Sequence, residues 1–513
     1  MYKAVLLIIS LTYIFYIQLH TAWNENRYLD LVFSIVNYQT LNIDHYHYNT
    51  GDKSYNNNHY YSGCAPGFAI INVPVYFLLK NSLFKFVNPN FQSSLIKENY
   101  LRQVGFFTNQ ELKYVDNAVF KKLIENYPYK EFLLSNFFLV IFSVILFSIL
   151  TSYLIYRISL LLLNNQTYSI ISMLLYSFGT IIFPYSTAFY SHTTVTFFLF
   201  ASFYLLSFEQ QINKNKIVVS GILSGTAMLC DYYAILVAML IYGFLLVKNK
   251  QQWKKSVLFI IGFVIPLIVL FIYNYICFND LFAVAYNYSV IWQKNYNHGI
   301  LGVAFPDLFI LLRLLFGLER GYFIYMPVFL LSIYGIIGII KNKHKYSTEI
   351  LFGAAVFIVL LLFNSARSND WNAGSSFGPR YLIPAIPFLF LSVIIALQKN
   401  KILVFLLGTI SVLMNWFGAM CWNVESAVKN IKYFVNNGLS SSLERYISPN
   451  NAAIHNLHLV FILTVVILAL FIIHYSIYRV KFIKTFIKLL SVTAVFILVI
   501  TFIFGYLITS KMY

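Results

Sequence analysis

The residues best suited to chemistry gather in one stretch of the chain, residues 23–67. Glu25 and Arg27 lie two positions apart there, and Asp44 and Asp52 follow. A carboxylate can take a proton from a hydroxyl, and a guanidinium can bind phosphate through two parallel hydrogen bonds. The simpler interpretation is an ion pair at a membrane surface beside turn-forming aspartates. Glu25, Asp44 and Asp52 are the predicted catalytic carboxylates, and the choice among them stays open.

Basic residues near apolar segments form a second group. Arg320 and Arg380 each precede an apolar segment and have glycines close by in sequence, which allow a ligand to approach the backbone. Together with Arg27 and Lys53, they are the basic residues predicted to bind an anionic group such as a phosphate. The alternative for the two glycine-flanked arginines is ordinary anchoring among lipid headgroups.

Composition determines the class of protein that must position these residues. Apolar residues make up 59% and charged residues 11% of the chain, against roughly 25% charged in soluble domains. Repeated runs of about 20 apolar residues are long enough to cross a bilayer. They predict an all-α polytopic membrane protein with about 13 transmembrane helices, near residues 3–19, 132–156, 168–184, 187–207, 217–231, 233–247, 256–277, 322–340, 349–364, 381–397, 402–419, 457–478 and 487–509.

The placement of charge predicts the orientation. With the N-terminus in the cytoplasm, the inner segments hold 17 of the 36 basic residues and only two acids, Glu209 and Glu349. Short inner loops rich in lysine are what the positive-inside rule expects. The net charge of +18 therefore reflects topology. Nucleic-acid binding is not expected, because no binding motif accompanies the basic residues.

The predicted organisation is a single transmembrane domain over residues 1–513, capped on the outside by loops. The long outer segments are residues 20–131 and 278–321. Each contains an apolar stretch, residues 66–86 and 303–318, that we predict to form a helix in the outer membrane interface.

Polar groups concentrate at the outer ends of the predicted helices. Ionisable side chains near membrane depth are costly and usually face a protein cavity. We therefore predict one outward-facing polar cavity, roofed by residues 20–131, and assign Tyr28, His192 and Asp231 to its lining. A single histidine in such a place is more often a hydrogen-bonding group than a catalyst.

Common catalytic motifs are missing from the sequence. It contains no nucleotide-binding loop, HExxH or GxSxG pattern, and the four cysteines lack metal or redox spacing. No cytoplasmic segment is large enough for a nucleotide site, so the donor of an enzyme of this kind should come from the membrane. No metal ligands are assigned and no cofactor is predicted, with a divalent metal left open.

Several short motifs resemble those of a known superfamily. The run Asn24-Glu25-Asn26-Arg27-Tyr28, followed by the Pro66-Gly67 turn, resembles the first outer loop of the GT-C glycosyltransferases. The branch it is most similar to holds protein O-mannosyltransferases, lipid A aminoarabinose transferases and their bacterial relatives. Residues 185–192 and 377–384 also look like segments of bacterial members. Two positions depart from the pattern: Asn24 stands where the first acid is usual, and Cys64 where a lysine is usual.

The resemblance implies an inverting glycosyltransferase with a GT-C fold in a bacterial cytoplasmic membrane. Its implied partners are membrane lipids, a polyprenyl-phosphate-linked sugar donor, and an acceptor hydroxyl on a lipid, glycan or protein. The active site would lie on the outer face, where a carboxylate deprotonates the acceptor and arginines stabilise the departing lipid phosphate. The alternatives are a lipid or glycolipid transporter (flippase) and a non-catalytic relative.

Overall fold

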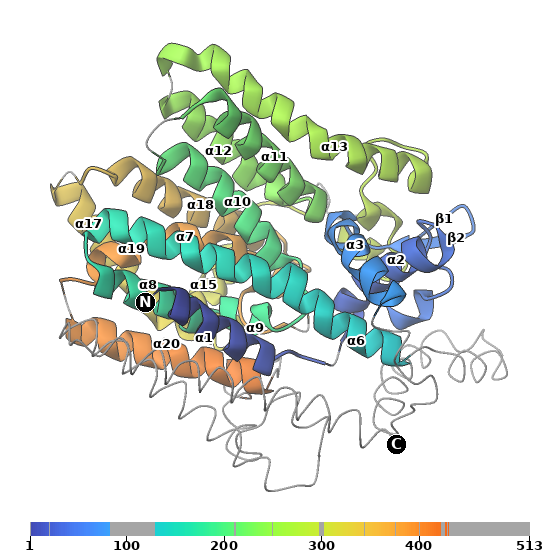
Figure 1. Ribbon diagram of the computed structural model, residues 1–513, viewed down its shortest axis with the longest axis horizontal. Helices are drawn as coiled ribbons and strands as arrows, with labels where there is room; N and C mark the ends of the chain where they lie inside the picture. The colour runs from blue at the N-terminus through green and yellow to red at the C-terminus, as the bar shows by residue number, and fades with distance from the viewer. Residues whose placement is uncertain are drawn as a thin grey trace, which may run out of the picture.

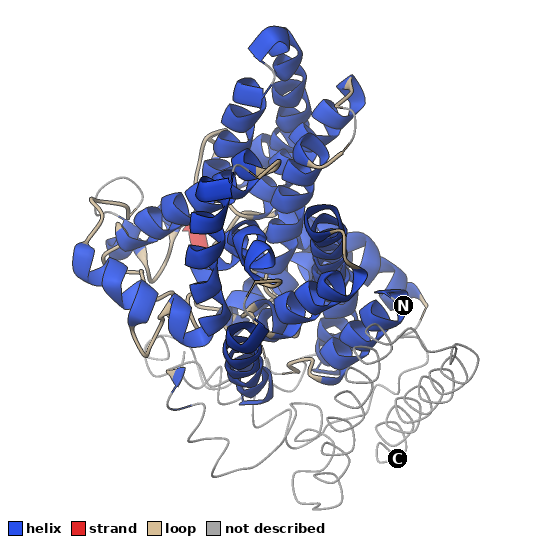
Figure 2. Ribbon diagram, turned by 90° about the vertical axis from the view of Figure 1, so that its left-hand side faces the viewer, coloured by secondary structure: helices blue, strands red, loops and turns tan. Residues whose placement is uncertain are grey.

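The computed structural model describes residues 2–19, 21–82, 129–209, 212–248, 250–296, 302–342, 344–374, 376–399, 401–421, 426, 427 and 429. Helices dominate this part of the chain, and the one sheet within it is a two-stranded hairpin. Figure 2 shows the helices filling the molecule. The predicted all-α class is confirmed.

Four helices of the described residues are long and apolar enough to cross a membrane: Phe132–Leu163, Trp253–Phe278, Ser347–Ser365 and Lys401–Met420. At 1.5 Å per residue, about 20 residues span the roughly 30 Å hydrocarbon core. Shorter apolar helices pack beside them in one bundle (Figure 1). The chain is therefore a multi-pass membrane protein.

Every predicted span that falls within the described residues contains helix, although the observed bounds differ from the predicted ones by several residues in places. Their bounds are α1 Tyr2–Phe15, α6 Tyr129–Leu139 continued by η3 Val140–Ile145 and α7 Leu146–Leu163, α8 Gln166–Phe178, α9 Ile182–Ser186, α10 His192–Ser207, α11 Lys214–Cys230, α12 Ala234–Lys248, α13 Val257–Phe278, α17 Leu330–Asn342, α18 Ser347–Ser365, α19 Ile386–Ala396 and α20 Lys401–Cys421. The predicted spans 457–478 and 487–509 lie outside the described residues.

Two predicted spans are interrupted. Span 168–184 divides into α8 and α9 at Gly179, which caps α8. Span 322–340 starts as α16 Tyr322–Tyr325 and η6 Pro327–Phe329 before α17 begins. Pro327 is the first residue of η6, a position where the backbone N–H that proline lacks is not needed.

A cap lies at one end of the bundle, where Figure 1 shows α2, α3 and the hairpin together; its position on the outer side of the membrane stays a prediction. It consists of α2 Trp23–Tyr38, η1 His47–Asn49, β1 Lys53–Asn56, β2 His59–Ser62 and α3 Gly67–Asn81. The sequence prediction treated α2 as loop, because its first turn is polar. Glu25 stabilises that turn, since its Oε2 accepts the N–H of Ala22 at 3.3 Å.

The second outer segment packs onto this cap. Its elements are η5 Ala285–Tyr288, α14 Gln293–Tyr296 and α15 Leu308–Phe316. Ser54 forms a bridge with Ser289, the N–H of Val290 donates to the carbonyl of Lys53 at 3.1 Å, and the Ser54 hydroxyl donates to the carbonyl of Ala285 at 2.6 Å. Helices α3 and α15 fall inside the two stretches predicted to form helices; their position in the membrane interface stays a prediction.

Small residues let α11 and α13 approach closely. A Cβ added to Gly262 would lie 2.1 Å from the carbonyl oxygen of Val218, and one added to Gly221 would lie 2.1 Å from that of Phe259. Backbone contact of this kind is typical of helix pairs in membranes. These contacts lie in the half of α11 that begins at Lys214, and Asp231 follows the other end of the helix.

We predict that Gly262→Ala forces α11 and α13 apart and destabilises the protein by about 1–3 kcal/mol, the usual cost of overpacking. Gly243→Ala on α12 is the matched control, because nothing lies within 4 Å of a Cβ added there. Thermal unfolding of the purified protein in detergent should show a lower midpoint for Gly262→Ala only. Equal midpoints for the two variants would contradict the close-packing explanation.

Candidate active site

A cavity of about 620 Å³ lies where the cap meets the helical bundle. Its walls come from α2, the hairpin end, the start of α10, the α11–α12 junction, residues 286–296 and residues 369–381. Six of the predicted site residues line it: Arg27, Tyr28, Asp52, His192, Asp231 and Arg380. Segments far apart in sequence thus converge on one polar space.

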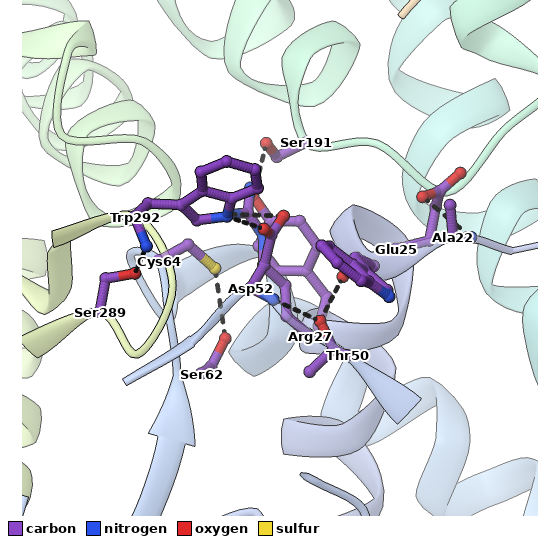
Figure 3. A network of polar contacts seen from close by, with 12 residues as sticks. Ala22, Glu25, Arg27, Thr50, Asp52, Ser62, Cys64, Ser191, Ser289 and Trp292 are labelled. Carbon is purple, nitrogen blue, oxygen red and sulfur yellow. Dashed lines mark hydrogen bonds and ion pairs between the residues drawn. The ribbon is translucent and has the colours of Figure 1, made fainter. Parts of the chain in front are cut away.

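Arg27 and Asp52 form the centre of one wall. Arg27 Nη1 lies 3.6 Å from Asp52 Oδ2, and the guanidinium carbon lies 5.0 Å from the centroid of the Tyr28 ring. Asp52 also accepts a hydrogen bond at Oδ1 from Nε1 of Trp292, at 2.8 Å. Figure 3 shows Asp52 between these two partners. Among the described residues, the buried Nε of Arg27 has no hydrogen-bond partner, so this guanidinium retains capacity to bind an anion.

Arg380 supplies a second buried guanidinium. Its guanidinium carbon lies 5.4 Å from the ring centroids of both Tyr190 and Tyr381. Its Nε is buried and has no hydrogen-bond partner in the part of the chain that the structure describes. Within the described residues, no carboxylate lies within 4 Å of it. Aromatic faces stabilise such a cation without using up its hydrogen-bond donors.

Two further carboxylates face the cavity. Asp231 accepts the N–H of Tyr233 at Oδ1, at 3.1 Å, and its Oδ2 lies 3.8 Å from His192 Nδ1. Asp370 is paired with Arg367 and accepts the hydroxyl of Tyr381 at 2.9 Å. Asp370 was not among the predicted site residues.

Aromatic side chains make up much of the remaining lining. Trp23 and Trp292 have ring centroids 6.5 Å apart, and Tyr286 stacks on Tyr296 at 4.7 Å. Flat rings with polar edges suit the apolar faces and hydroxyls of a sugar. The sequence analysis assigned no role to Trp292, Tyr286 or Tyr296. Their clustering within a short part of the predicted second outer segment was the one sequence feature that could have indicated them.

Glu25 does not line the cavity. Its side chain is buried beside Ala22, away from the Arg27–Asp52–Trp292 contacts in Figure 3. Burial raises the pKa of its carboxyl from 4.5 to about 7, although backbone N–H groups and the charges of Arg380 and Arg27 act in the opposite direction. Its observed contact is with the first turn of α2, and a catalytic role stays a prediction.

Asp44 and Lys53 hold the hairpin. Asp44 Oδ2 lies 2.6 Å from His59 Nδ1, and its Oδ1 accepts the N–H of Tyr60 at 2.7 Å. Lys53 is fully buried and donates to the carbonyl of His47 at 3.1 Å, with His47 Nδ1 at 3.2 Å. Burial, together with the charge of Lys53, lowers the pKa of His47 to about 3, so this imidazole is neutral.

Arg320 holds one wall of the cavity through hydrogen bonds to the backbone of lining residues. It donates to the carbonyls of Asn372 at 2.7 Å and Gly374 at 2.8 Å, and both of these residues line the cavity. Arg320 itself is not part of the lining. The structure therefore brings together two of the four predicted phosphate ligands, Arg27 and Arg380, and one of the three predicted catalytic carboxylates, Asp52.

The described residues contain no group of three or more His, Cys, Asp and Glu side chains that could hold a metal ion.

Part of the chain matches the model of a known protein family. Residues 132–274 match the family model described as dolichyl-phosphate-mannose-protein mannosyltransferase. This match confirms the predicted resemblance to the GT-C membrane glycosyltransferases. A search of curated proteins finds no match.

Among solved structures, the chain is similar to ArnT from Cupriavidus metallidurans bound to undecaprenyl phosphate. The identity is 12%, with 78% of this chain and 59% of that chain covered and a TM-score of 0.47. The apo state of the same protein gives 13% identity, 78% and 60% coverage and a TM-score of 0.45. The chain thus spans about 60% of the length of those structures.

The raised pKa of Glu25 leads to a prediction about stability. Because its pKa is higher in the folded state than in the unfolded chain, its contribution to stability is fully present below pH 4.5 and is lost as the pH rises through about 7. This loss amounts to about 3 kcal/mol. Thermal unfolding between pH 5 and pH 8 should therefore show a flatter pH dependence for Glu25→Gln than for the wild type. Parallel curves would contradict a buried, raised-pKa carboxyl.

Proposed function

We propose that this protein transfers a sugar from a polyprenyl-phosphate donor to an acceptor hydroxyl. We place the reaction on the outer face of a bacterial cytoplasmic membrane, with the N-terminus in the cytoplasm. One observation carries the proposal: the guanidinium groups of Arg27, whose side chain is 12% exposed, and of Arg380, which is buried, line the same cavity as three carboxylates. The match to a mannosyltransferase family model over residues 132–274 supports the reaction class.

In this proposal the donor phosphate binds to Arg27 and Arg380. Both have a buried Nε without a partner among the described residues, and an arginine matches phosphate oxygens in pairs. As the bond between the anomeric carbon and the phosphate oxygen breaks, negative charge grows on the departing lipid phosphate. Fixed positive charge in a water-poor cavity stabilises that transition state. Asp52 holds Arg27 in position.

The attack in this scheme is a single displacement. The acceptor oxygen forms a bond to the anomeric carbon on the face opposite the phosphate, which inverts the configuration. A carboxylate of the cavity takes the proton of the acceptor hydroxyl. The products are the glycosylated acceptor and free polyprenyl phosphate. The paired rings of Trp23 and Trp292 lie in the same lining and are suited to contact the sugar.

The lipid chain of the donor needs an apolar path to the cavity. The loop of residues 369–374 lines the cavity, and Trp371 in it packs under Arg313 of α15 at 4.3 Å. Helix α15 exposes a row of large apolar side chains: Leu308, Phe309, Leu312 and Phe316. We place the isoprenoid chain along this helix, where lipid can enter from the side.

The direct test uses the purified full chain in vesicles with undecaprenyl-phosphate mannose, and parallel donors carrying glucose, N-acetylglucosamine or aminoarabinose. The acceptor is an envelope extract containing lipids, glycans and proteins from a strain that lacks the protein. We expect one donor to release undecaprenyl phosphate and label a component of the extract. Movement of donor across the vesicle without a new glycosidic bond would favour a transporter, and neither activity would favour a non-catalytic role.

We predict that Arg27→Ala and Arg380→Ala each weaken binding of undecaprenyl phosphate about 10- to 100-fold, because a hydrogen bond to a charged group contributes about 1.5–3 kcal/mol. Arg157→Ala is the control, since this exposed arginine lies on α7, outside the cavity lining. Native mass spectrometry of the protein with added undecaprenyl phosphate measures the difference. Unchanged affinity in both cavity variants would remove these arginines from the phosphate site.

A further inference from the structure

The three carboxylates of the cavity are not equivalent. Asp52 uses one oxygen for Trp292 and faces Arg27 with the other. Asp370 is ion-paired with Arg367. If either took up a proton, a buried guanidinium would lose its counter-charge, and an unpaired buried charge is expensive. Both are therefore better suited to holding arginines than to exchanging protons.

Asp231 is free of this constraint. No guanidinium lies within 4 Å of it in the described part of the chain, and its Oδ1 is fixed by the N–H of Tyr233. Its Oδ2 accepts no hydrogen bond there; the nearest polar partner is His192 Nδ1, at 3.8 Å, beyond hydrogen-bond length. The side chain is 18% exposed and faces the cavity. One oxygen is thus anchored and the other is open to a ligand.

The surroundings place this oxygen beside the proposed phosphate site. Arg367, Arg27 and Arg380 all act electrostatically on Asp231, so it lies near these guanidinium groups, with no ion pair to any of them in the described part of the chain. The residue follows α11 directly, and the close α11–α13 packing fixes that helix. His192 starts α10 and is held between the rings of Tyr190 and Tyr381, with centroid distances of 6.1 and 6.2 Å. The carboxylate therefore has a rigid setting.

We propose that Asp231 is the general base of the transfer reaction, with Oδ2 accepting the proton of the acceptor hydroxyl; this rests on the proposed function. The acceptor oxygen then bonds to the anomeric carbon, the bond to the phosphate oxygen breaks, and polyprenyl phosphate leaves with the electron pair. The proton stays on Asp231 until it passes to solvent. Asp52, in contrast, is a positioning residue for Arg27.

The experiment compares Asp231→Ala and Asp231→Asn with Asp52→Asn, using undecaprenyl phosphate binding and donor turnover by the full-length protein in vesicles. Both Asp231 variants should lose about 10²- to 10⁴-fold in transfer to the acceptor extract, the usual contribution of a general base. Their affinity for undecaprenyl phosphate should change less than about threefold. Retained binding would also show that the variants are folded. Asp52→Asn should instead weaken that binding. Asp280→Asn, in an exposed loop, is the matched control.

Sodium azide separates a base from a residue that only shapes the cavity. Azide is already an anion, so its attack on the anomeric carbon needs no proton acceptor. In Asp231→Ala, azide should restore release of undecaprenyl phosphate at least about tenfold, with a glycosyl azide as the product. Loss of both reactions while undecaprenyl phosphate still binds would overturn the base assignment. So would normal hydroxyl transfer by Asp231→Ala. A wild type that turns over no donor would refute the proposed function itself.

Discussion

The cost of burying a guanidinium in an apolar protein is the constraint on which the outer half of this molecule depends. Arg320, Arg367 and Arg380 are buried, and the side chain of Arg27 is only 12% exposed. Arg27 has Asp52, Arg367 has Asp370, Arg320 has backbone carbonyls, and Arg380 has tyrosine rings. Asp52 comes from the first predicted outer segment, residues 370–374 supply the partners of Arg367 and Arg320, and Tyr190 lies just before α10. Satisfying these charges therefore brings several distant segments together around the cavity.

The contacts of Asp52 show how this works. A single carboxylate faces Arg27 of α2 and accepts a hydrogen bond from Trp292 of the second outer segment, 240 residues further along the chain. Backbone bonds between Lys53 and Val290 continue the same junction. The two outer segments therefore form one roof, and the groups that join them also line the cavity.

Fixing the arginines divides the carboxylates of the cavity into two kinds. Asp52 and Asp370 each have a guanidinium partner, whereas Asp231 has its Oδ2 open. The cations also differ in their partners. Arg27 faces a carboxylate, whereas Arg380 lies near the rings of Tyr190 and Tyr381, which leave its hydrogen-bond donors available. A cavity that combines uncommitted positive and negative groups suits a reaction in which one charge develops on a leaving phosphate while a proton moves elsewhere.

The sequence by itself determined the membrane class, the helical spans within the described residues and the six predicted site residues that line the cavity. These follow from local properties: apolar runs of bilayer length, and polar groups too costly to leave in lipid. Only the tertiary structure decided that Glu25, Asp44, Lys53 and Arg320 lie outside the lining while Trp292, Tyr286 and Asp370 belong to it. Sequence distance does not reveal which charge finds which partner. Asp52 meets Trp292, and Arg320 meets the 372–374 loop, because folding brings those segments together.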